Sequence, residues 1–286
     1  MKSKIKKCME LPDLDGLIGP VTELAWEAGR RILELFRSDS LDVYYKADCT
    51  PVTKADQAAH DHIVAGLERL TPGVPVLSEE SGASQRGRGR SGRDWHWLVD
   101  PLDGTRRFIR GSEEFTVNIA LVFGGKPILG VVDAPAMGTV YFGHMGGGAF
   151  LCEGGSGAPV PISVRKPPVR PVRVLAGRSH TVSAVELYVA AMEVTHWRRI
   201  SSSLKFCLIA RGEADVYPRM ETISEWDTAA GQAVLESAGG AVVDLNGRPL
   251  YYGKESNRVP PFIACGDPSH DWLQYLPKPS PTTPTP

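Results

Sequence analysis

The stretch from Trp97 to Thr105 constrains the fold of this chain more than any other. It opens with an apolar run that is too short for a helix and is typical of a buried strand. The run stops at Asp100, and Pro101 both disfavours helix at that aspartate and removes the next backbone N–H from any ladder. We therefore expect a buried strand that ends at Asp100 and is followed by a tight turn.

This turn brings together groups that bind cations and phosphate. Asp100 and Asp103 supply two carboxylates, and Leu102 between them supplies a backbone carbonyl. Gly104 and Thr105 follow with exposed backbone N–H groups. Oxygen ligands of this kind suit Mg²⁺, and the N–H groups suit a phosphate. Asp-Pro and Asp-Gly are also common turn dipeptides, so the turn taken alone more often marks an ordinary loop.

Three further acids lie at the ends of predicted elements. Glu79 follows the apolar pair Val76-Leu77, Asp56 heads a helical pattern, and Asp227 opens another. Each acid by itself is typical of a solvated loop or a helix cap. Their repeated position at element ends, rather than within a charged surface face, favours a shared site.

Several motifs in one order resemble a known family. The acidic motifs Ser78-Glu79-Glu80, Asp100-Pro-Leu-Asp103-Gly-Thr105 and Trp226-Asp227-Thr-Ala-Ala-Gly231 resemble those of the inositol monophosphatase superfamily of Mg²⁺-dependent, often lithium-sensitive phosphatases. Within it, the chain is most similar to the CysQ-type 3'(2'),5'-bisphosphate nucleotidases, from about Leu17 to Tyr252. The segments that carry this closer likeness are Lys46-Ala-Asp48, Pro51-Val-Thr53, Phe115-Thr-Val-Asn-Ile-Ala-Leu121, Lys126-Pro-Ile-Leu-Gly130, Arg178-Ser-His180, Ser202-Ser-Leu-Lys205-Phe-Cys-Leu208 and Tyr217-Pro-Arg219.

Hydrophobic periodicity predicts a different pattern of secondary structure in each half of the chain. In the first half, helical patterns cover Leu17–Phe36 and the segment after Asp56. The antiparallel meander predicted after them comprises Phe115–Phe123, Pro127–Val132, Val140–Phe142 and Ala149–Cys152. From about Val160, strands and helices alternate in the βαβ manner. The predicted elements there are Val172–Leu175, Val182–Val194, Arg198–Ile200, Leu204–Arg211, Ala214–Tyr217, Asp227–Ala238 and Ala241–Val243.

The expected architecture combines α+β and α/β organisation. The resemblance implies a layered αβαβα sandwich, the sugar phosphatase fold. We expect a polar N-terminal extension at residues 1–16, an α+β metal-binding domain with an antiparallel sheet at 17–157, an α/β substrate-recognition domain at 158–276, and a disordered tail at 277–286. Within the first domain, an arginine-rich stretch at 86–93 contains a GxGxxG spacing without a preceding strand or a following helix, so we expect a solvated loop.

The resemblance implies two metal ions. Glu79, Asp100 and the Leu102 carbonyl would hold one Mg²⁺, while Asp100, Asp103 and Asp227 would hold the second. A third, weaker ion near Asp56 is a further expectation. The chemistry agrees, because so many carboxylates cannot share one cleft in ionised form unless cations neutralise them, and oxygen ligands without histidine or cysteine favour Mg²⁺ over Zn²⁺.

Catalysis is expected to use water as the nucleophile, since no Ser, Cys or His stands in a nucleophile motif. By resemblance, Asp56 and Thr105 orient and deprotonate a metal-activated water, and Glu79 takes part in catalysis as well as metal binding. The Gly104 and Thr105 N–H groups would hold the scissile phosphate.

Substrate recognition is expected in the second half. The resemblance assigns substrate binding to Ser179, His180, Ser202, Lys205 and Asp227, together with Gly104 and Thr105, and gives Arg219 weaker support. Taken singly, His180 is more typical of a surface loop and Lys205 of a solvated helix face.

The implied reaction is hydrolysis of adenosine 3',5'-bisphosphate (PAP) to AMP and phosphate by a phosphoric monoester hydrolase, with the sulfated nucleotide PAPS as a second substrate and a link to sulfur assimilation. An inositol monophosphatase or a phosphatase like fructose-1,6-bisphosphatase is the nearest alternative, and a non-catalytic nucleotide-binding sensor is another. The chain departs from its relatives at Arg106-Arg107, where they usually carry Lys-Glu. This change adds positive charge beside the site and bears on substrate preference.

Composition limits the partners and the compartment. The net charge of −1 gives no global field for nucleic acid, so we expect a small-molecule partner. Five cysteines, an odd and widely spaced set, favour a reducing compartment. There is no apolar run of the about 20 residues that a membrane helix needs, and the basic start lacks the apolar core of a signal peptide. We expect a cytoplasmic protein, with peripheral attachment to the inner face of the cell membrane as a second expectation.

Overall fold

The computed structural model describes residues 13–37, 43–45, 51–81, 95–154, 157–168, 170–178, 182–194 and 197–277. Several sequence-based expectations concern other residues. The arginine-rich stretch at 86–93, Ser179, His180, most of the extension at 1–16 and the tail after residue 277 lie outside the described residues.

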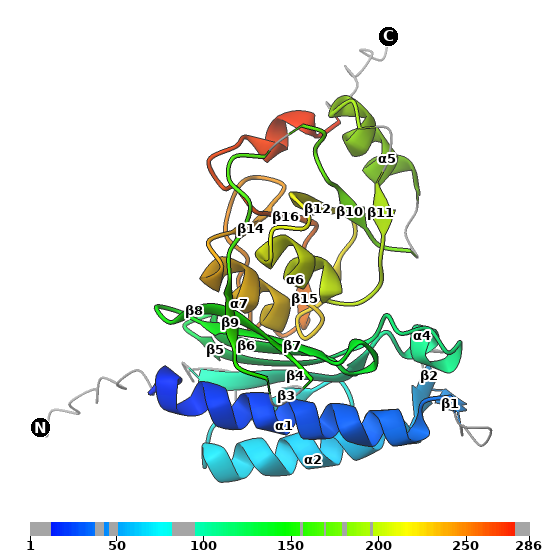
Figure 1. The fold of residues 1–286 in the computed structure, drawn as a ribbon, viewed down its shortest axis with the longest axis vertical. Coiled ribbons are helices and arrows are strands. Elements are labelled where there is room, and N and C mark those ends of the chain that lie inside the picture. Colours follow the sequence, from blue (N-terminus) through cyan, green and yellow to red (C-terminus); the bar gives the residue numbers. More distant parts are fainter. Residues whose placement is uncertain are drawn as a thin grey trace, which may run out of the picture.

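A seven-stranded sheet organises the first half of the molecule (Figure 1). Its strands lie side by side in chain order, and β3 pairs with β4 in parallel while all later neighbours are antiparallel. The predicted meander is therefore confirmed. The strands are β3 (Val76–Ser78), β4 (Trp95–Asp103), β5 (Thr116–Phe123), β6 (Lys126–Ala134), β7 (Thr139–His144), β8 (Gly148–Glu153) and β9 (Val160–Ile162).

Helices cover both faces of this sheet (Figure 1). On one face lie α1 (Leu14–Leu35) and α2 (Lys54–Leu70), and the buried stripe of α1 includes the predicted core residues Val21, Leu24, Ala28 and Ile32. On the other face lie α6 (Leu204–Ala210) and α7 (Ala229–Ser237). Helix α1 begins at Leu14, three residues before the predicted start, because Asp13 caps it by accepting a hydrogen bond from the Gly16 N–H at 3.0 Å.

A smaller β layer lies beyond α6 and α7. This layer consists of a three-stranded sheet in the order β12 (Val216–Arg219), β16 (Phe262–Cys265) and β14 (Ala241–Asp244), and of the pair β10 (Leu175–Ala176) and β11 (Arg198–Arg199). A single bridge between Val174 and Val216 links the two, and α5 (Val182–Ala191) lies outside them (Figure 1). The parallel pair β10–β11 flanks α5 as the predicted βαβ alternation requires. By contrast, β16 is antiparallel to both β12 and β14, since no helix connects β14 to β16. The molecule is thus layered αβαβα.

The remaining elements are short. They are β1 (Val43–Tyr45), β2 (Pro51–Thr53), β13 (Ile223–Ser224), β15 (Arg258–Val259), α4 (Thr105–Ile109) and the 3₁₀ turns η1 (Pro135–Met137) and η2 (Trp272–Tyr275). Because β9 pairs with β8 in the large sheet, we propose that the boundary between the two parts falls after residue 162 rather than at 157.

The prediction that the central strand ends at Asp100 is wrong. Strand β4 continues to Asp103, but its ladder with β5 is irregular between the pairs Asp100–Asn118 and Asp103–Thr116. Two residues of β4, Pro101 and Leu102, stand opposite one residue of β5 there. Pro101 still interrupts the ladder, because it has no N–H to donate, and the strand accommodates it as a bulge instead of stopping.

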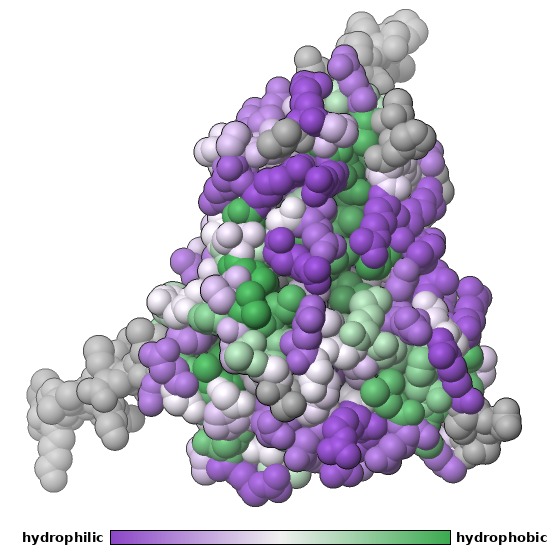
Figure 2. Space-filling model, in the orientation of Figure 1, coloured by the Kyte–Doolittle hydropathy of each residue, from purple (hydrophilic) through white to green (hydrophobic). Residues whose placement is uncertain are grey.

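The surface is mixed in polarity. Figure 2 shows hydrophilic residues over much of one face, with hydrophobic residues reaching the surface in several separate patches. Among the described residues, no helix combines the length and apolarity needed to cross a membrane.

Candidate active site

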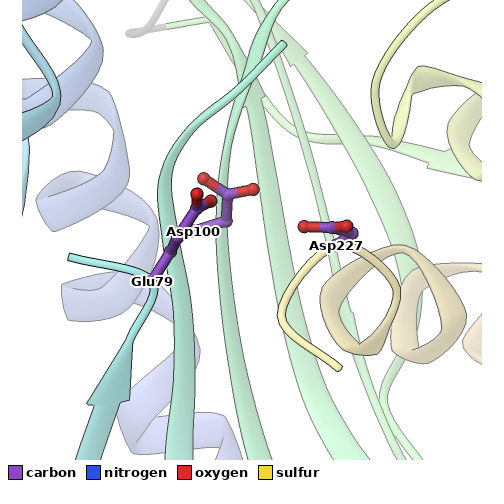
Figure 3. A group of neighbouring side chains, drawn as sticks. All are labelled: Glu79, Asp100 and Asp227. Carbon is purple, nitrogen blue, oxygen red and sulfur yellow. The ribbon is translucent and has the colours of Figure 1, made fainter. Parts of the chain in front are cut away.

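Three carboxylates from distant parts of the chain meet beside the bulge of the central strand β4. Glu79 follows β3, Asp100 lies in β4, and Asp227 lies in the turn before α7. One carboxylate oxygen from each lies within 4.8 Å of the others. Figure 3 shows Glu79 and Asp100 side by side, with Asp227 facing them from its turn. The structure therefore brings together three of the acids that the sequence analysis expected to converge.

The electrostatics of this cluster favour bound cations. Burial raises the pKa of Asp100 well above its usual range, and the neighbouring Glu79, Asp103 and Asp227 add to the effect. Burial, then Asp103 and Glu79, likewise raise the pKa of Asp227. Without a cation, these acids would have to take up protons to coexist. The donor set consists of carboxylates, with the Leu102 carbonyl close by, which fits a hard divalent cation.

Asp103 reaches the same pocket because of the bulge in β4. In a regular strand, residues three apart point to opposite faces. The extra residue in β4 between Asp100 and Asp103 removes this alternation, so both side chains line one pocket. Asp103 Oδ2 accepts hydrogen bonds from the Ser203 N–H at 2.7 Å and from Asn118 Nδ2 at 3.4 Å.

Asp103 also faces a cation. Burial raises its pKa, while the charge of Lys205 acts in the opposite direction. The carboxylate is therefore anchored towards α6 on one side and lies beside the acidic cluster on the other.

Thr105 and Asp56 form a hydrogen-bonded pair beside the cluster. Thr105 Oγ1 lies 3.2 Å from Asp56 Oδ1 and 3.1 Å from the Leu102 carbonyl oxygen, and its single proton can be donated to one of them at a time. The other oxygen of Asp56 accepts hydrogen bonds from the N–H and the hydroxyl of Thr53, both at 2.7 Å. Asp56 thus caps helix α2 and holds the site threonine with the same carboxylate.

The carboxyl of Asp56 is set up to accept a proton. Burial raises its pKa to about 6, and the hydrogen bonds from Thr53 only partly oppose this shift. A carboxylate with such a pKa is closer to the range of an effective general base than an exposed aspartate.

Gly104 joins the bulge to α4 in a conformation that favours glycine. Its φ is 99°, and a Cβ at this position would lie 3.0 Å from the backbone oxygen of Glu114. The close approach of these two backbones explains why glycine follows Asp103.

The residues proposed for substrate binding are only partly described. Ser202 and Lys205 line the pocket together with Arg219, whereas Ser179 and His180 lie outside the described residues. Lys205 is not a solvated helix residue: it is 5% exposed, and its Nζ donates hydrogen bonds to the carbonyls of Ser202 and, at 3.4 Å, Ile200. Burial lowers its pKa to about 8, and the nearby Asp103 charge opposes that shift.

Some pocket contacts were missed by sequence reasoning. Ser203, rather than Ser202, donates to Asp103, and its hydroxyl donates to Asn118 Oδ1 at 2.6 Å. Glu114 accepts two hydrogen bonds from Arg178, at 2.8 and 2.7 Å. One signal was available for Asn118, because Thr116 and Asn118 alternate as polar residues within an otherwise apolar strand.

The pocket that contains these groups has a volume of about 450 Å³, and its charged lining residues are of both signs. The acids are Glu79, Asp100, Asp103 and Asp227, and the basic residues are Arg106, Arg107, Arg178, Lys205, Arg219 and Arg258. A pocket lined in this way can hold cations at the acids and an anionic molecule at the basic residues.

Comparison with known proteins agrees with this geometry. A sequence model described as the Inositol monophosphatase family matches residues 13–267. The 3'(2'),5'-bisphosphate nucleotidase CysQ of Escherichia coli K12 is 44% identical over 248 residues, which cover 86% of this chain and 98% of that relative.

Solved structures show the same likeness. The crystal structure of CysQ from Bacteroides thetaiotaomicron, described as a bacterial member of the inositol monophosphatase family, has a TM-score of 0.76 and 36% identity, covering 90% of this chain and 99% of that one. An inositol monophosphatase (IMPase) from Thermotoga maritima has a TM-score of 0.74 and 26% identity, covering 91% and 96% of the two chains.

Proposed function

Since this chain belongs to the inositol monophosphatase family, we propose that it is a 3'(2'),5'-bisphosphate nucleotidase that hydrolyses adenosine 3',5'-bisphosphate to AMP and phosphate. PAPS is the second substrate that we propose. The observation that carries the proposal is the cluster of Glu79, Asp100 and Asp227, which lines one pocket together with Thr105, the hydrogen-bond partner of Asp56. The similarity to CysQ nucleotidases supports the choice of substrate.

Two Mg²⁺ ions are the cofactors that we propose. Glu79, Asp100 and the Leu102 carbonyl would hold one, and Asp100, Asp103 and Asp227 would hold the other. When bound, such ions neutralise the acids, lower the pKa of water and offset charge on the phosphate. A third, weaker ion near Asp56 remains part of the proposal.

The chain's own residues would orient the attack. Thr105 donates its hydroxyl proton to Asp56, which leaves its oxygen free to accept a hydrogen bond from a water molecule. The raised pKa of Asp56 allows its carboxylate to receive a proton as the water attacks the phosphorus. Gly104 and Thr105 would donate their backbone N–H groups to the phosphate oxygens.

Recognition of the rest of the substrate would fall to the basic residues that line the pocket. Lys205 is buried beside Asp103, and two backbone carbonyls accept hydrogen bonds from its Nζ, so its ammonium group is held in one position. Ser202 and Arg219 line the pocket nearby. We retain Ser179 and His180 as proposed ligands on the sequence likeness alone.

The cytoplasm is the compartment that we propose. The three described cysteines, Cys152, Cys207 and Cys265, are free and buried, which suits a reducing environment.

An assay of phosphate release tests the function. Purified protein is incubated with Mg²⁺ and, in parallel, with adenosine 3',5'-bisphosphate, inositol 1-phosphate or fructose 1,6-bisphosphate. We expect turnover of the nucleotide to exceed that of both sugar phosphates, and inhibition by Li⁺. Preference for a sugar phosphate would reject the nucleotidase assignment, and binding of the nucleotide without phosphate release would instead identify a sensor.

A further inference from the structure

Arg107 is a half-buried cation that lines the pocket. It lies in α4, two residues after Thr105. Its Nε donates a hydrogen bond to the Ser201 hydroxyl at 3.1 Å, which fixes the plane of the guanidinium. The side chain is therefore oriented before any ligand arrives.

Most of the other pocket cations already have a partner within the protein. Arg178 makes the bidentate pair with Glu114, and Lys205 lies beside Asp103. Arg258 donates to Thr222 and Ser224 at the pocket rim. Arg178 and Lys205 therefore face carboxylates of the fold, and the terminal nitrogens of Arg258 are occupied by neutral oxygens.

Arg107 differs from these cations. Within the described part of the chain, no carboxylate lies within ion-pairing distance of its guanidinium, and its two terminal nitrogens make no hydrogen bond. Arg106 is its neighbour but is exposed and makes no side-chain hydrogen bond to a described residue. A guanidinium that is held by Nε, with both terminal nitrogens available, has the fork geometry that binds phosphate.

The partner of Arg107 is itself held rigidly. The Ser201 N–H donates to Glu114 Oε2 at 3.0 Å. Burial alone would raise the pKa of Glu114, but its hydrogen bonds with Arg178 and Ser201 lower it overall, so the carboxylate stays ionised. The chain of contacts Arg178–Glu114–Ser201–Arg107 joins the segment before β5 to the loop before α6.

From this arrangement we infer that Arg107 binds the second phosphate of the substrate, the one that is not hydrolysed, and so selects bisphosphorylated nucleotides over monophosphorylated ones. This inference rests on the proposed function. Thr105 and Arg107 belong to one short helix, so the spacing between the phosphate at the acidic cluster and the phosphate at Arg107 is set by a single element.

Kinetics with two matched substrates test the inference. Adenosine 3',5'-bisphosphate and adenosine 3'-monophosphate carry the same scissile phosphate and differ only in the second one. In Arg107→Gln we expect kcat/KM for the bisphosphate to fall roughly 10- to 100-fold, mainly through KM, and kcat/KM for the monophosphate to stay within about twofold. Arg107→Lys keeps the charge but not the forked geometry of the guanidinium, so its kcat/KM for the bisphosphate should fall less than that of Arg107→Gln.

Two controls separate recognition from general effects. Arg110→Gln removes the same charge from an exposed position next to α4 that does not line the pocket, and it should change neither substrate's kinetics. Ser201→Ala removes the hydroxyl that accepts the hydrogen bond from Arg107 and that also contacts Glu114, and it should lower kcat/KM for the bisphosphate moderately and by more than for the monophosphate.

The possible failures can be told apart. Equal losses on both substrates in Arg107→Gln would mean that Arg107 only positions the loop before α6, and unchanged kinetics would mean that it does not touch substrate. Either result overturns the inference. The proposed function would still be supported in both cases, provided that the wild type is active on the bisphosphate. A wild type that releases no phosphate from the bisphosphate would overturn the function and the inference together.

Discussion

Replacing Asp133 with asparagine should stabilise the protein at neutral pH. Asp133 lies in β6 with no exposed surface, and neither carboxylate oxygen has a hydrogen-bond partner among the described residues. Burial therefore raises its pKa well above the usual 3.8. In the unfolded chain the same group ionises near its usual pKa, so unfolding releases a proton throughout the interval between the two pKa values.

The sign and the magnitude follow from this difference. Because the folded pKa is the higher one, the contribution of Asp133 to stability is complete below about pH 4 and is lost as the pH rises towards the folded pKa. The loss amounts to about 1.4 kcal/mol for each pH unit in that interval. The asparagine side chain does not titrate, so the advantage of Asp133→Asn should grow with pH at that slope.

Urea unfolding followed by tryptophan fluorescence, at pH 5, 6, 7 and 8, measures this. The difference between variant and wild type isolates residue 133, since the other titrating groups are common to both proteins. Parallel stability curves over this range would refute the reasoning, because they would mean that Asp133 is ionised and solvated in the folded state.

The same site allows a steric test. A Cβ added to Gly29 of α1 would lie 2.0 Å from Asp133 Oδ2 and 3.0 Å from Pro135 Cβ. Gly29→Ala should therefore cost about 1–3 kcal/mol in the wild type and clearly less in an Asp133→Ala background. Gly19→Ala is the matched control in the same helix, since its Cβ would meet nothing within 4 Å, and it should stabilise by up to about 1 kcal/mol.

Three further predictions concern the pocket. Asp103→Asn and Thr105→Ala should each fold normally by circular dichroism yet lose roughly 100-fold or more in kcat, because they remove a proposed metal ligand and the partner of Asp56. Wild-type turnover in either variant would reject the assigned role. Chelation with EDTA should stop phosphate release and lower the melting temperature. Mg²⁺ added at 100 times its Kd should restore about 2.7 kcal/mol of stability. A melting temperature that does not change with Mg²⁺ would contradict the metal site. Lys205→Met keeps the buried volume but removes the charge, so KM for adenosine 3',5'-bisphosphate should rise roughly 10- to 100-fold in steady-state kinetics. An unchanged KM would show that this lysine contributes to packing alone.

Much of the fold was predictable because local patterns determine it. The antiparallel meander follows from short apolar strands separated by glycine turns, and the buried stripe of α1 follows from helical periodicity. The antiparallel placement of β16 was not predictable in the same way, since it depends on contacts with β12 and β14 that are distant in the chain. The continuation of β4 past Pro101 depends on its pairing with β5, which no local rule contains.

The acids of the pocket were predictable for a different reason. A carboxylate at the end of an element is easy to find in a sequence, and the motifs around Glu79, Asp100 and Asp227 all resemble those of one family, which indicated a shared site. The roles of Ser203 and Glu114 depend on backbone N–H groups and side-chain directions that only the assembled structure provides. The burial of Lys205 likewise arises from the packing of α6 against its neighbours rather than from the polarity of the residue.

Because the carboxylate of Asp56 serves both the fold and the site, positions 56 and 105 should respond differently to selection for abundance and selection for turnover. One oxygen closes the first turn of α2 and the other fixes Thr105, so an apolar substitution at position 56 disturbs the helix and the hydroxyl at once. In a saturation mutagenesis library sorted only for cellular abundance, position 56 should already be depleted of apolar residues. Position 105 should tolerate them there and lose them only when survival depends on turnover.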